Sequence, residues 1–307
     1  MRVISLLPGA TEIVAALADG DSEVTLVGVT HECDYPANVH SLPRVTASAI
    51  DARAASGAID AEVRALASTG SPVFALDEAM IARLRPDVLV TQALCEVCAV
   101  SETDVRALAS RLRAPGAAGP QVVTLCGTTL AGVFDDVRAV AERLGRAPQG
   151  ELLLESLRAR LRAVHERLKA HRAPRPRMAV IEWADPLYAA GHWVPELVHR
   201  AGGIDVLASP GAHSRPISLD TLVDADPDII CIAPCGFDCG RAAEEAGRLR
   251  SLPAWQTLRD REVWALDANA LTSRAGPRLV DAVEVLAAIG NPDLFPELPP
   301  DRARRIA

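Results

Sequence analysis

The order of apolar runs along the chain constrains its fold more than any other feature of the sequence. Short, β-branched apolar runs alternate with stretches whose apolar residues recur at helical spacing. Strand-like runs occupy residues 3–7, 26–30, 73–76, 88–91, 122–125, 178–182, 228–232 and 263–266, and helix candidates occupy residues 12–17, 59–67, 102–112, 130–144 and 277–288. The strand-like runs are apolar on both faces, as is typical of parallel strands covered by helices. The alternation therefore predicts an α/β fold.

This alternation is interrupted once. Residues 149–172 hold no strand-like run, and their leucine and valine side chains follow one helix face while charged side chains occupy the other. About 24 residues at 1.5 Å each give a helix of about 36 Å, which ends before Pro174 and Pro176. We expect two lobes joined by this rigid helix. The alternative is one continuous doubly wound sheet with a long crossover helix.

The same reading divides the chain into three parts. Residues 1–146 are expected to form an N-terminal α/β lobe and residues 147–173 the spanning helix. Residues 174–307 are expected to form a C-terminal α/β lobe. A ligand cleft between the lobes is the natural place for function in such an arrangement.

Charge and lysine content exclude several classes of function. Lys169 is the only lysine among 32 basic residues, so no Walker-A phosphate loop exists and a Schiff-base lysine could only be this one, inside a charged helical stretch. The net charge is −8, without a block of like charge. This balance argues against nucleic acid or an anionic membrane as the main partner.

Seven cysteines raise the question of location. The first residues read as a buried strand entering a turn, without the apolar stretch and cleavage site of a signal peptide, and no apolar run reaches the roughly 18 residues of a membrane span. We expect a cytoplasmic protein without membrane insertion, or a periplasmic or cell-surface one if the natural start lies upstream. In a reducing compartment, grouped cysteines indicate metal binding or reactivity more than disulfides.

Polar, aromatic and thiol side chains follow the carboxyl ends of the predicted strands. Ligands bind at these ends in open α/β sheets, so we expect these side chains to converge on one cleft. The candidate ligand-binding residues are His31, Glu32, Tyr35, Gln92, Glu96, Trp183, His192, Trp193, Arg215, Phe237 and Arg274.

Two residue types among these candidates have a specific chemical rationale. His31 and His192 could ligate a metal ion through a neutral imidazole; the alternative is a hydrogen-bonded surface histidine. Arg215 and Arg274 offer a bidentate fork to a ligand carboxylate or phosphate. The alternative for these arginines is an ordinary surface charge.

The pair Cys95-x-x-Cys98 is a separate signal. Its spacing lets two thiolates share one soft metal ion or form a redox pair. A zinc or iron site would need further ligands from Cys33, Cys235, Cys239 or His31. The alternative is that these small apolar thiols pack inside loops, which is also what we expect of Cys126 and Cys231.

Several short motifs follow one another along the chain in a characteristic order. They are Ile-Ser-Leu-Leu-Pro at 4–8, Val-Gly-Val at 27–29, Asp-Tyr-Pro at 34–36, Leu-Arg-Pro-Asp at 84–87, Ala-Gly-Gly at 201–203, Ala-Asp-Pro-Asp at 225–228 and Ser-Arg-Ala-Gly-Pro-Arg at 273–278. Together they resemble the cobalamin- and iron-siderophore-type periplasmic binding proteins of ABC transporters over nearly the whole chain, and the cobalamin-binding subgroup most. The resemblance implies two Rossmann-like lobes bridged by a long helix, with the ligand between them and little hinge motion. It also implies that the metal that His31 or His192 could ligate is the cobalt of a corrinoid.

The resemblance also implies a partner. Members of this family dock onto a permease through one acidic residue per lobe, and Glu102 and Asp220 lie near those positions. Acidic residues at helix starts are also common capping groups. An ABC permease is therefore an expected partner only if the chain is exported, together with a small-molecule ligand and no nucleic acid.

The chain departs from the family in two ways. No export signal or lipid anchor is recognisable, and the loops where cobalamin binders place aromatic rings carry Gln92 with the thiol-rich stretch, and Ser214-Arg215-Pro216. Trp193 and Tyr35 could take over the aromatic role.

Two functions follow from these observations. The first is binding of a cobalamin-like or other metal-chelate molecule between the lobes without chemical turnover. The alternative is a cytosolic metal-binding enzyme or metal-handling protein that uses the Cys/His loops. The sequence therefore favours a binding protein and leaves enzymatic activity open.

Overall fold

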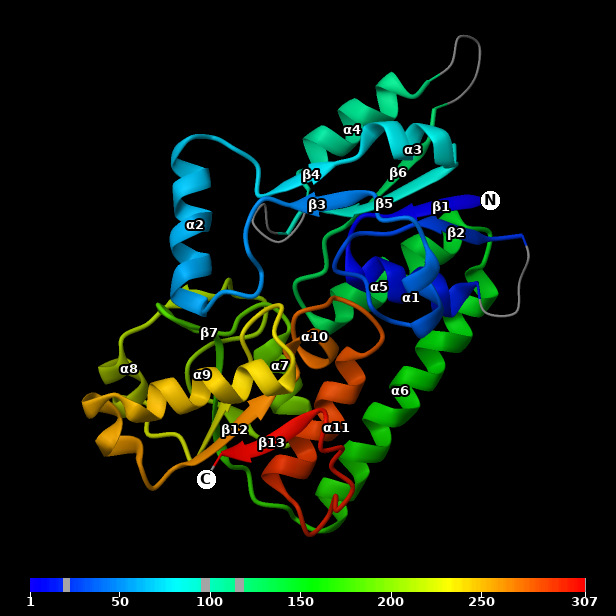
Figure 1. Ribbon diagram of the computed structural model, residues 1–307. Helices are drawn as coiled ribbons and strands as arrows, with labels where there is room; N and C mark the ends of the chain where they lie inside the picture. The colour runs from blue at the N-terminus through cyan, green and yellow to red at the C-terminus, as the bar shows by residue number, and fades with distance from the viewer. Residues whose placement is uncertain (19–22, 95–99, 114–118, 307) are drawn as a thin grey trace.

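The computed structural model describes residues 1–18, 23–94, 100–113 and 119–306. It shows two α/β lobes with separate sheets, and one long helix, α6 (Ala147–Ala170), that runs along both of them (Figure 1). The expected α/β class and two-lobe architecture are confirmed. The alternative of one continuous sheet is wrong, because no strand of the N-terminal lobe pairs with a strand of the C-terminal lobe among the described residues.

The N-terminal lobe is built on a parallel sheet of four strands. Its order is β2-β1-β5-β6, with β1 at Arg2–Ser5, β2 at Thr25–Gly28, β5 at Val88–Gln92 and β6 at Gln121–Leu125. Successive residues of β1 enter opposite cores: Val3 packs with α1 (Pro8–Leu17) and α5 (Leu130–Arg143), and Ile4 packs with α3 (Glu78–Leu84) and α4 (Glu102–Arg111). Both faces are therefore covered, as the apolar strands predict.

A small hairpin stands beside this sheet. Strand β3 (Thr46–Ser48) pairs antiparallel with β4 (Phe74–Leu76), and α2 (Ser56–Ser68) connects them after a loop. Residues 73–76 are thus a strand, but the expectation that they join the covered parallel sheet is wrong. Ala75 is exposed at the centre of β4, because this strand lies outside the main sheet. Helix α2 extends from the hairpin toward the other lobe (Figure 1).

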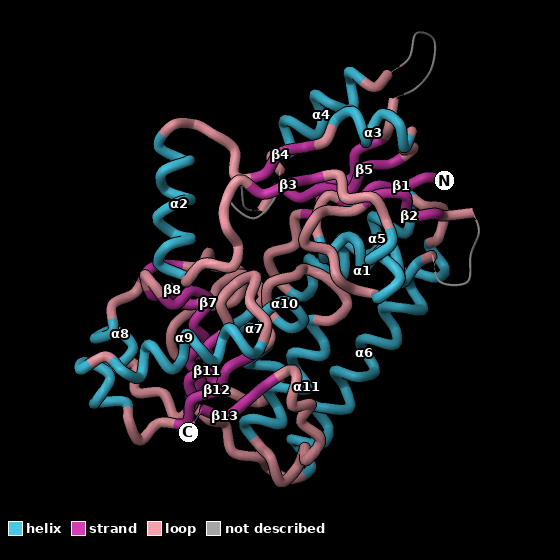
Figure 2. The backbone as a smooth tube through the Cα atoms, viewed as in Figure 1, coloured by secondary structure: helices cyan, strands magenta, loops and turns pink. Residues whose placement is uncertain are grey.

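The C-terminal lobe has a mixed sheet in the order β10-β8-β7-β11-β12-β13. Strands β7 (Arg177–Ala184), β11 (Ile229–Ile232) and β12 (Glu262–Leu266) are parallel at its centre. The outer strands β8 (Leu187–Ala189), β10 (Arg215–Pro216) and β13 (Ala303–Ile306) are antiparallel, and β9 (Ile204–Asp205) pairs with the start of β7. Figure 2 shows these strands stacked below the hairpin and α2.

Helices cover both faces of this second sheet as well. Residues of α7 (Val194–Arg200) and α11 (Leu279–Gly290) share one core with alternate residues of the central strands. Residues of α8 (Leu219–Asp224), α9 (Cys239–Ser251) and the 3₁₀ helix η2 (Pro253–Leu258) share the core on the opposite face. The remaining short helices are η1 (Ala37–Ser41) and α10 (Ala268–Leu271).

Helix α6 joins the two lobes through one continuous core. Its buried residues Leu154, Leu157 and Val164 belong to the same cluster as apolar residues of α1 and α5 in one lobe and of α7 and α11 in the other. Arg160 pairs with Asp281 and Glu284 of α11 at 2.6 and 2.5 Å. A shared core of this kind resists hinge motion, because opening the lobes would expose apolar surface. None of the helices in the described parts of the chain is long and apolar enough to span a membrane.

Candidate ligand site between the lobes

The parallel strands of both sheets end in loops that meet between the lobes. Arg274, after β12, reaches Asp34, after β2. Arg241, at the start of α9, donates to the carbonyl of Ala54 before α2, at 2.9 Å. Such carboxyl-terminal edges are the usual ligand sites of open α/β sheets.

His31 lies in the loop after β2, on the side of the N-terminal lobe. Its Nδ1 lies 2.7 Å from Oγ1 of Thr46, and its ring centre lies 5.4 Å from that of Phe74. Burial, together with the nearby Arg44, lowers the pKa of His31, so the imidazole is neutral at pH 7. In the tautomer whose Nδ1 donates to Thr46, Nε2 carries the lone pair that a metal centre needs.

Cys33, two residues further on, is buried inside the protein. The thiol is 2% exposed, and its Sγ lies 3.0 Å from Oγ1 of Thr11 and 3.2 Å from Oγ1 of Thr30. Burial raises the pKa of the Cys33 thiol, which opposes the thiolate form that binds metal.

Arg274 and Tyr35, both expected to bind ligand, join the lobes in this structure. The Arg274 guanidinium donates to both carboxylate oxygens of Asp34 and to the carbonyl of Glu32. Tyr35 lies under Arg278, whose guanidinium carbon is 4.2 Å from the ring centre. The Arg274 guanidinium is therefore already bonded to groups of the opposite lobe. Whether it also meets a ligand stays a prediction.

An aromatic pair lies on the side of the C-terminal lobe. The rings of Trp183, in β7, and Phe237, before α9, meet edge to face at 5.5 Å, and the Arg241 guanidinium lies 3.6 Å from the Phe237 ring centre. Phe237 is buried and Trp183 is half-buried, so Trp183 is the more accessible ring. Arg241 ties this pair to the segment before α2.

His192 lies on a neighbouring loop of the same lobe, with a left-handed backbone at φ 52°. Its Nε2 is buried without a hydrogen-bond partner among the protein atoms described, and its ring centre lies 5.2 Å from that of His213. Burial and His213 both lower the pKa of His192, so the ring is neutral. A buried unsatisfied nitrogen is a natural place for water or a polar ligand atom.

The loop that holds Gly211 also faces the N-terminal lobe. A Cβ on Gly211 would lie 3.4 Å from Cγ2 of Thr129, at the start of α5. Nearby, burial raises the pKa of Glu182, whose carboxylate accepts from the backbone N–H of Gly191. Trp193, by contrast, is buried and donates its Nε1–H to the carbonyl of Thr272 at 2.8 Å, which is a core role.

The remaining candidates are scattered. Gln92 is half-buried at the end of β5, and Arg215 lies on the outer strand β10, where it donates to the carbonyl of Leu207. Cys235 is half-buried, and Cys239 is buried with its Sγ 3.6 Å from the carbonyl oxygen of Ala265. Cys231 is buried as expected, but the expectation that Cys126 is packed is wrong, because this residue, just after β6, is exposed. Cys95, Glu96 and Cys98 lie outside the described residues. Within the described parts, no three His, Cys, Asp or Glu side chains gather around one point.

The two acidic residues expected to meet a permease lie on different lobes. Glu102 begins α4 and accepts from Thr124 at 2.7 Å and from Arg106 at 2.8 Å, and these bonds lower its pKa. Asp220 is exposed in the first turn of α8, which Ser218 caps.

Sequence reasoning missed the groups that hold the lobes together. These are Glu12, Asp34, Arg278, Arg241 and Glu245. One signal was available: Glu12 falls on the apolar face of α1, whose neighbours Ala10, Ile13 and Val14 are fully buried. A carboxylate at such a position requires a buried partner.

The fold and the meeting of the two strand edges define a two-lobed binding protein of the class with a single long connecting helix. Residues 3–269 match the model of the periplasmic binding protein family. The chain therefore belongs to this family, and the expected resemblance is confirmed.

Three known proteins illustrate the likeness. The chain is 26% identical over 287 residues to a vitamin B12-binding protein of Vibrio cholerae serotype O1, covering 92% of this chain and 86% of that protein. It is 23% identical over 301 residues to an ABC transporter substrate-binding lipoprotein of Bacillus subtilis, covering 96% and 82%. A periplasmic heme-binding protein of Pseudomonas aeruginosa has the same fold, with a TM-score of 0.67, 21% identity and coverage of 100% and 95%.

Proposed function

We propose that this protein is the substrate-binding component of an ABC transporter and that it holds a cobalamin-like or other metal-chelate molecule between its lobes without chemical turnover. The observation that carries this proposal is the family match over residues 3–269. The likeness to a vitamin B12-binding protein and to a heme-binding protein supports a metal macrocycle as the first ligand to test.

The side chains between the lobes support this ligand class. Trp183 offers an aromatic ring that can stack on a macrocycle. His31, on the opposite lobe, offers a neutral imidazole that can ligate cobalt or iron. One face for stacking and one nitrogen for the metal are what a metal macrocycle needs.

The permease is the second part of the proposal. Asp220 and Glu102 are carboxylates on the surfaces of the two lobes, as a partner with two basic patches would require. This role places the protein outside the cytoplasmic membrane. Cell fractionation with sequencing of the native N-terminus tests the location, and a cytoplasmic protein would contradict it.

Titration of the purified full chain tests the ligand. Cyanocobalamin, hemin and a ferric siderophore are added separately, and binding is followed by calorimetry and by tryptophan fluorescence. We expect one of them to bind with 1:1 stoichiometry and to quench the fluorescence. Absence of a response to all three contradicts the proposal.

Two variants locate the binding event. Trp183→Leu should weaken binding and remove most of the quenching, because Trp183 is the more accessible ring of the aromatic pair. Trp264→Leu is the matched control, since Trp264 lies in β12 with its Nε1–H bonded to Glu262. His31→Ala should shift the absorption bands of the bound hemin or cobalamin if Nε2 ligates the metal.

The metal-handling alternative is tested separately. Elemental analysis after anaerobic purification should find less than one zinc or iron per chain if the protein is a simple binder. Stoichiometric metal that is lost in Cys95→Ala and Cys98→Ala would favour the alternative.

A further inference from the structure

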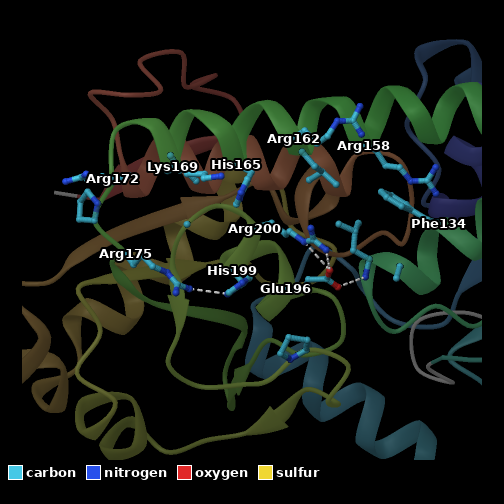
Figure 3. A pocket seen from close by; sticks show the side chains of 18 of the residues that line it. Phe134, Arg158, Arg162, His165, Lys169, Arg172, Arg175, Glu196, His199 and Arg200 are labelled. Atoms are coloured by element: carbon cyan, nitrogen blue, oxygen red, sulfur yellow. Dashed lines mark hydrogen bonds and ion pairs between the residues drawn. The ribbon is translucent and has the colours of Figure 1, made fainter.

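A groove of about 1180 Å³ lies along α6, away from the residues expected to bind the ligand. Helix α6 forms one side, and the first half of α5 together with the end of α7 forms the other (Figure 3). None of His31, Gln92, Trp183, His192 or Phe237 lines it.

The groove is strongly basic. Seven arginine and lysine side chains line it against two carboxylates, Asp135 and Glu196, in a chain whose net charge is −8. The cations are Arg138, Arg158, Arg162, Lys169, Arg172, Arg175 and Arg200, and His165 and His199 also line the groove. A concentration of positive charge in an acidic protein attracts anions.

A single row on α6 supplies most of this charge. Arg158, Arg162, His165 and Lys169 follow one another at intervals of three and four residues, which places them on one face of the helix. Arg172 continues the row just beyond the end of α6. Figure 3 shows the row together with His199 and Arg200 of α7. At 1.5 Å per residue the helical part of the row is about 16 Å long.

Few of these cations are neutralised. The two carboxylates that line the groove are engaged, because Glu196 pairs with Arg200 and accepts from the backbone N–H of Leu130, and Asp135 pairs with Arg138. Glu151 forms ion pairs with Arg138 and Arg158.

Four other groups remain without a counter-charge. The Arg175 side chain bonds to Nδ1 of His199 and to the carbonyl of Gly203, and to no carboxylate among the described residues. The side chains of Arg162, Lys169 and Arg172 make no ion pair or hydrogen bond among the described residues. Like charges at helical spacing destabilise the helix, so the row is costly unless an anion occupies the groove.

We propose that this groove is a second binding site, for an elongated polyanion of the polyphosphate type. Its length requires several charges in a line, and guanidinium forks match phosphate oxygens in pairs. The ligand would contact both lobes and α6 at once, because α5 belongs to the N-terminal lobe and α7 to the C-terminal lobe. This site does not depend on the ligand between the lobes.

Calorimetry with linear polyphosphate tests the proposal. We expect tripolyphosphate and longer chains to bind the full-length protein with an affinity that falls as salt rises, by analogy with other multivalent phosphate ligands. Orthophosphate and citrate should bind at least about tenfold more weakly, since neither spans the row. Equal binding of citrate, or binding of an oligoglutamate peptide but not of polyphosphate, overturns the proposal.

Matched charge reversals locate the site. The double variant Arg162→Glu with Lys169→Glu should weaken polyphosphate binding at least about tenfold and reduce the salt dependence. The control, Arg83→Glu with Arg259→Glu, changes the net charge equally at exposed positions outside the groove. An equal loss in both variants means that polyphosphate senses only net charge, and this also overturns the proposal. Unchanged binding of the interlobe ligand shows that the first site is intact.

Discussion

Arg278 donates from Nε and Nη2 to the two carboxylate oxygens of Glu12, at 3.0 and 2.5 Å, across 266 residues of sequence and from one lobe to the other. The side chains of Glu12 and Arg278 are 2% and 11% exposed. Arg274 approaches the same carboxylate at 3.6 Å and holds Asp34 in turn. The lobes are therefore joined by a buried ionic cluster as well as by α6.

Removing the charge of Glu12 should be costly, because it leaves the largely buried Arg278 without its paired anion, while Arg274 keeps Asp34. We expect Glu12→Gln to lower the free energy of unfolding by about 3–5 kcal/mol, measured by urea denaturation at pH 7. The control is Asp60→Asn, which breaks the i,i+4 pair with the exposed Arg64 and should cost less than about 1 kcal/mol.

A double variant separates the charge from the packing. Replacing both partners, as Glu12→Leu with Arg278→Met, removes the buried pair without leaving its charge unpaired. It should recover much of the stability lost in Glu12→Gln. A double variant as unstable as the single one would show that shape, and not charge, holds the lobes here.

Gly9 lets the backbone of α1 pack closely against the backbone of the other lobe. A Cβ at this position would lie 2.4 Å from the carbonyl oxygen of Ala275, a backbone atom that cannot rotate away. We expect Gly9→Ala to destabilise the protein by about 1–3 kcal/mol. Gly247→Ala is the matched control, since Gly247 lies inside α9 with no atom within 4 Å of its Cβ position; it should stabilise by up to about 1 kcal/mol. Thermal unfolding of both variants checks the opposite signs, and equal shifts would contradict the steric argument.

The architecture could be predicted because its signals are local. Both faces of β1 and β5 are apolar, and residues 149–172 have a helical period over a length that only a spanning helix uses. The position of β4 could not be predicted, because the choice between a parallel sheet and an antiparallel hairpin depends on which strand it meets. Residues 46–48 were not recognised as that partner.

The candidate site was predicted only in outline. The loops that carry His31, Trp183 and His192 were identified, since they follow strand ends. The pairing of Arg274 with Asp34 was not, because 240 residues separate them and no periodicity links the two. The basic row of α6 was visible in the sequence, but its exposure to a groove depends on where α7 packs.

A buried carboxylate, that of Glu245, joins the start of helix α2 to the C-terminal lobe, next to the bond from Arg241 to Ala54. Glu245 of α9 accepts from the backbone N–H of Ser56 at 3.2 Å and from its Oγ at 3.0 Å. Glu245→Gln keeps the shape but removes the charge, so it should loosen this contact. We expect faster amide hydrogen exchange in residues 54–59 and unchanged exchange in β11, measured by mass spectrometry. Glu244→Gln, at the exposed neighbouring position, is the control; a similar effect there would contradict the assignment.

Asp205 gives the protein a pH dependence of definite sign. Burial raises its pKa to about 6, although the N–H groups of Leu207 and Ala208 donate to its Oδ1 at 2.8 and 2.9 Å. The folded protein therefore binds a proton more tightly than the unfolded chain between the unfolded pKa of about 3.9 and pH 6. Stability falls as pH rises through this window, by about 3 kcal/mol in all, and the deficit stays constant above it.

Asp205→Asn isolates this contribution, because the amide keeps an oxygen for the two N–H donors and carries no charge. The difference in unfolding free energy between Asp205→Asn and the unmodified protein should grow in favour of the variant from pH 4 to pH 7.5, as measured by urea denaturation at both values. Asp224→Asn, at an exposed position at the end of α8, should follow the unmodified protein throughout. Parallel curves for Asp205→Asn and the unmodified protein would show that Asp205 is ionised at no cost in the folded state.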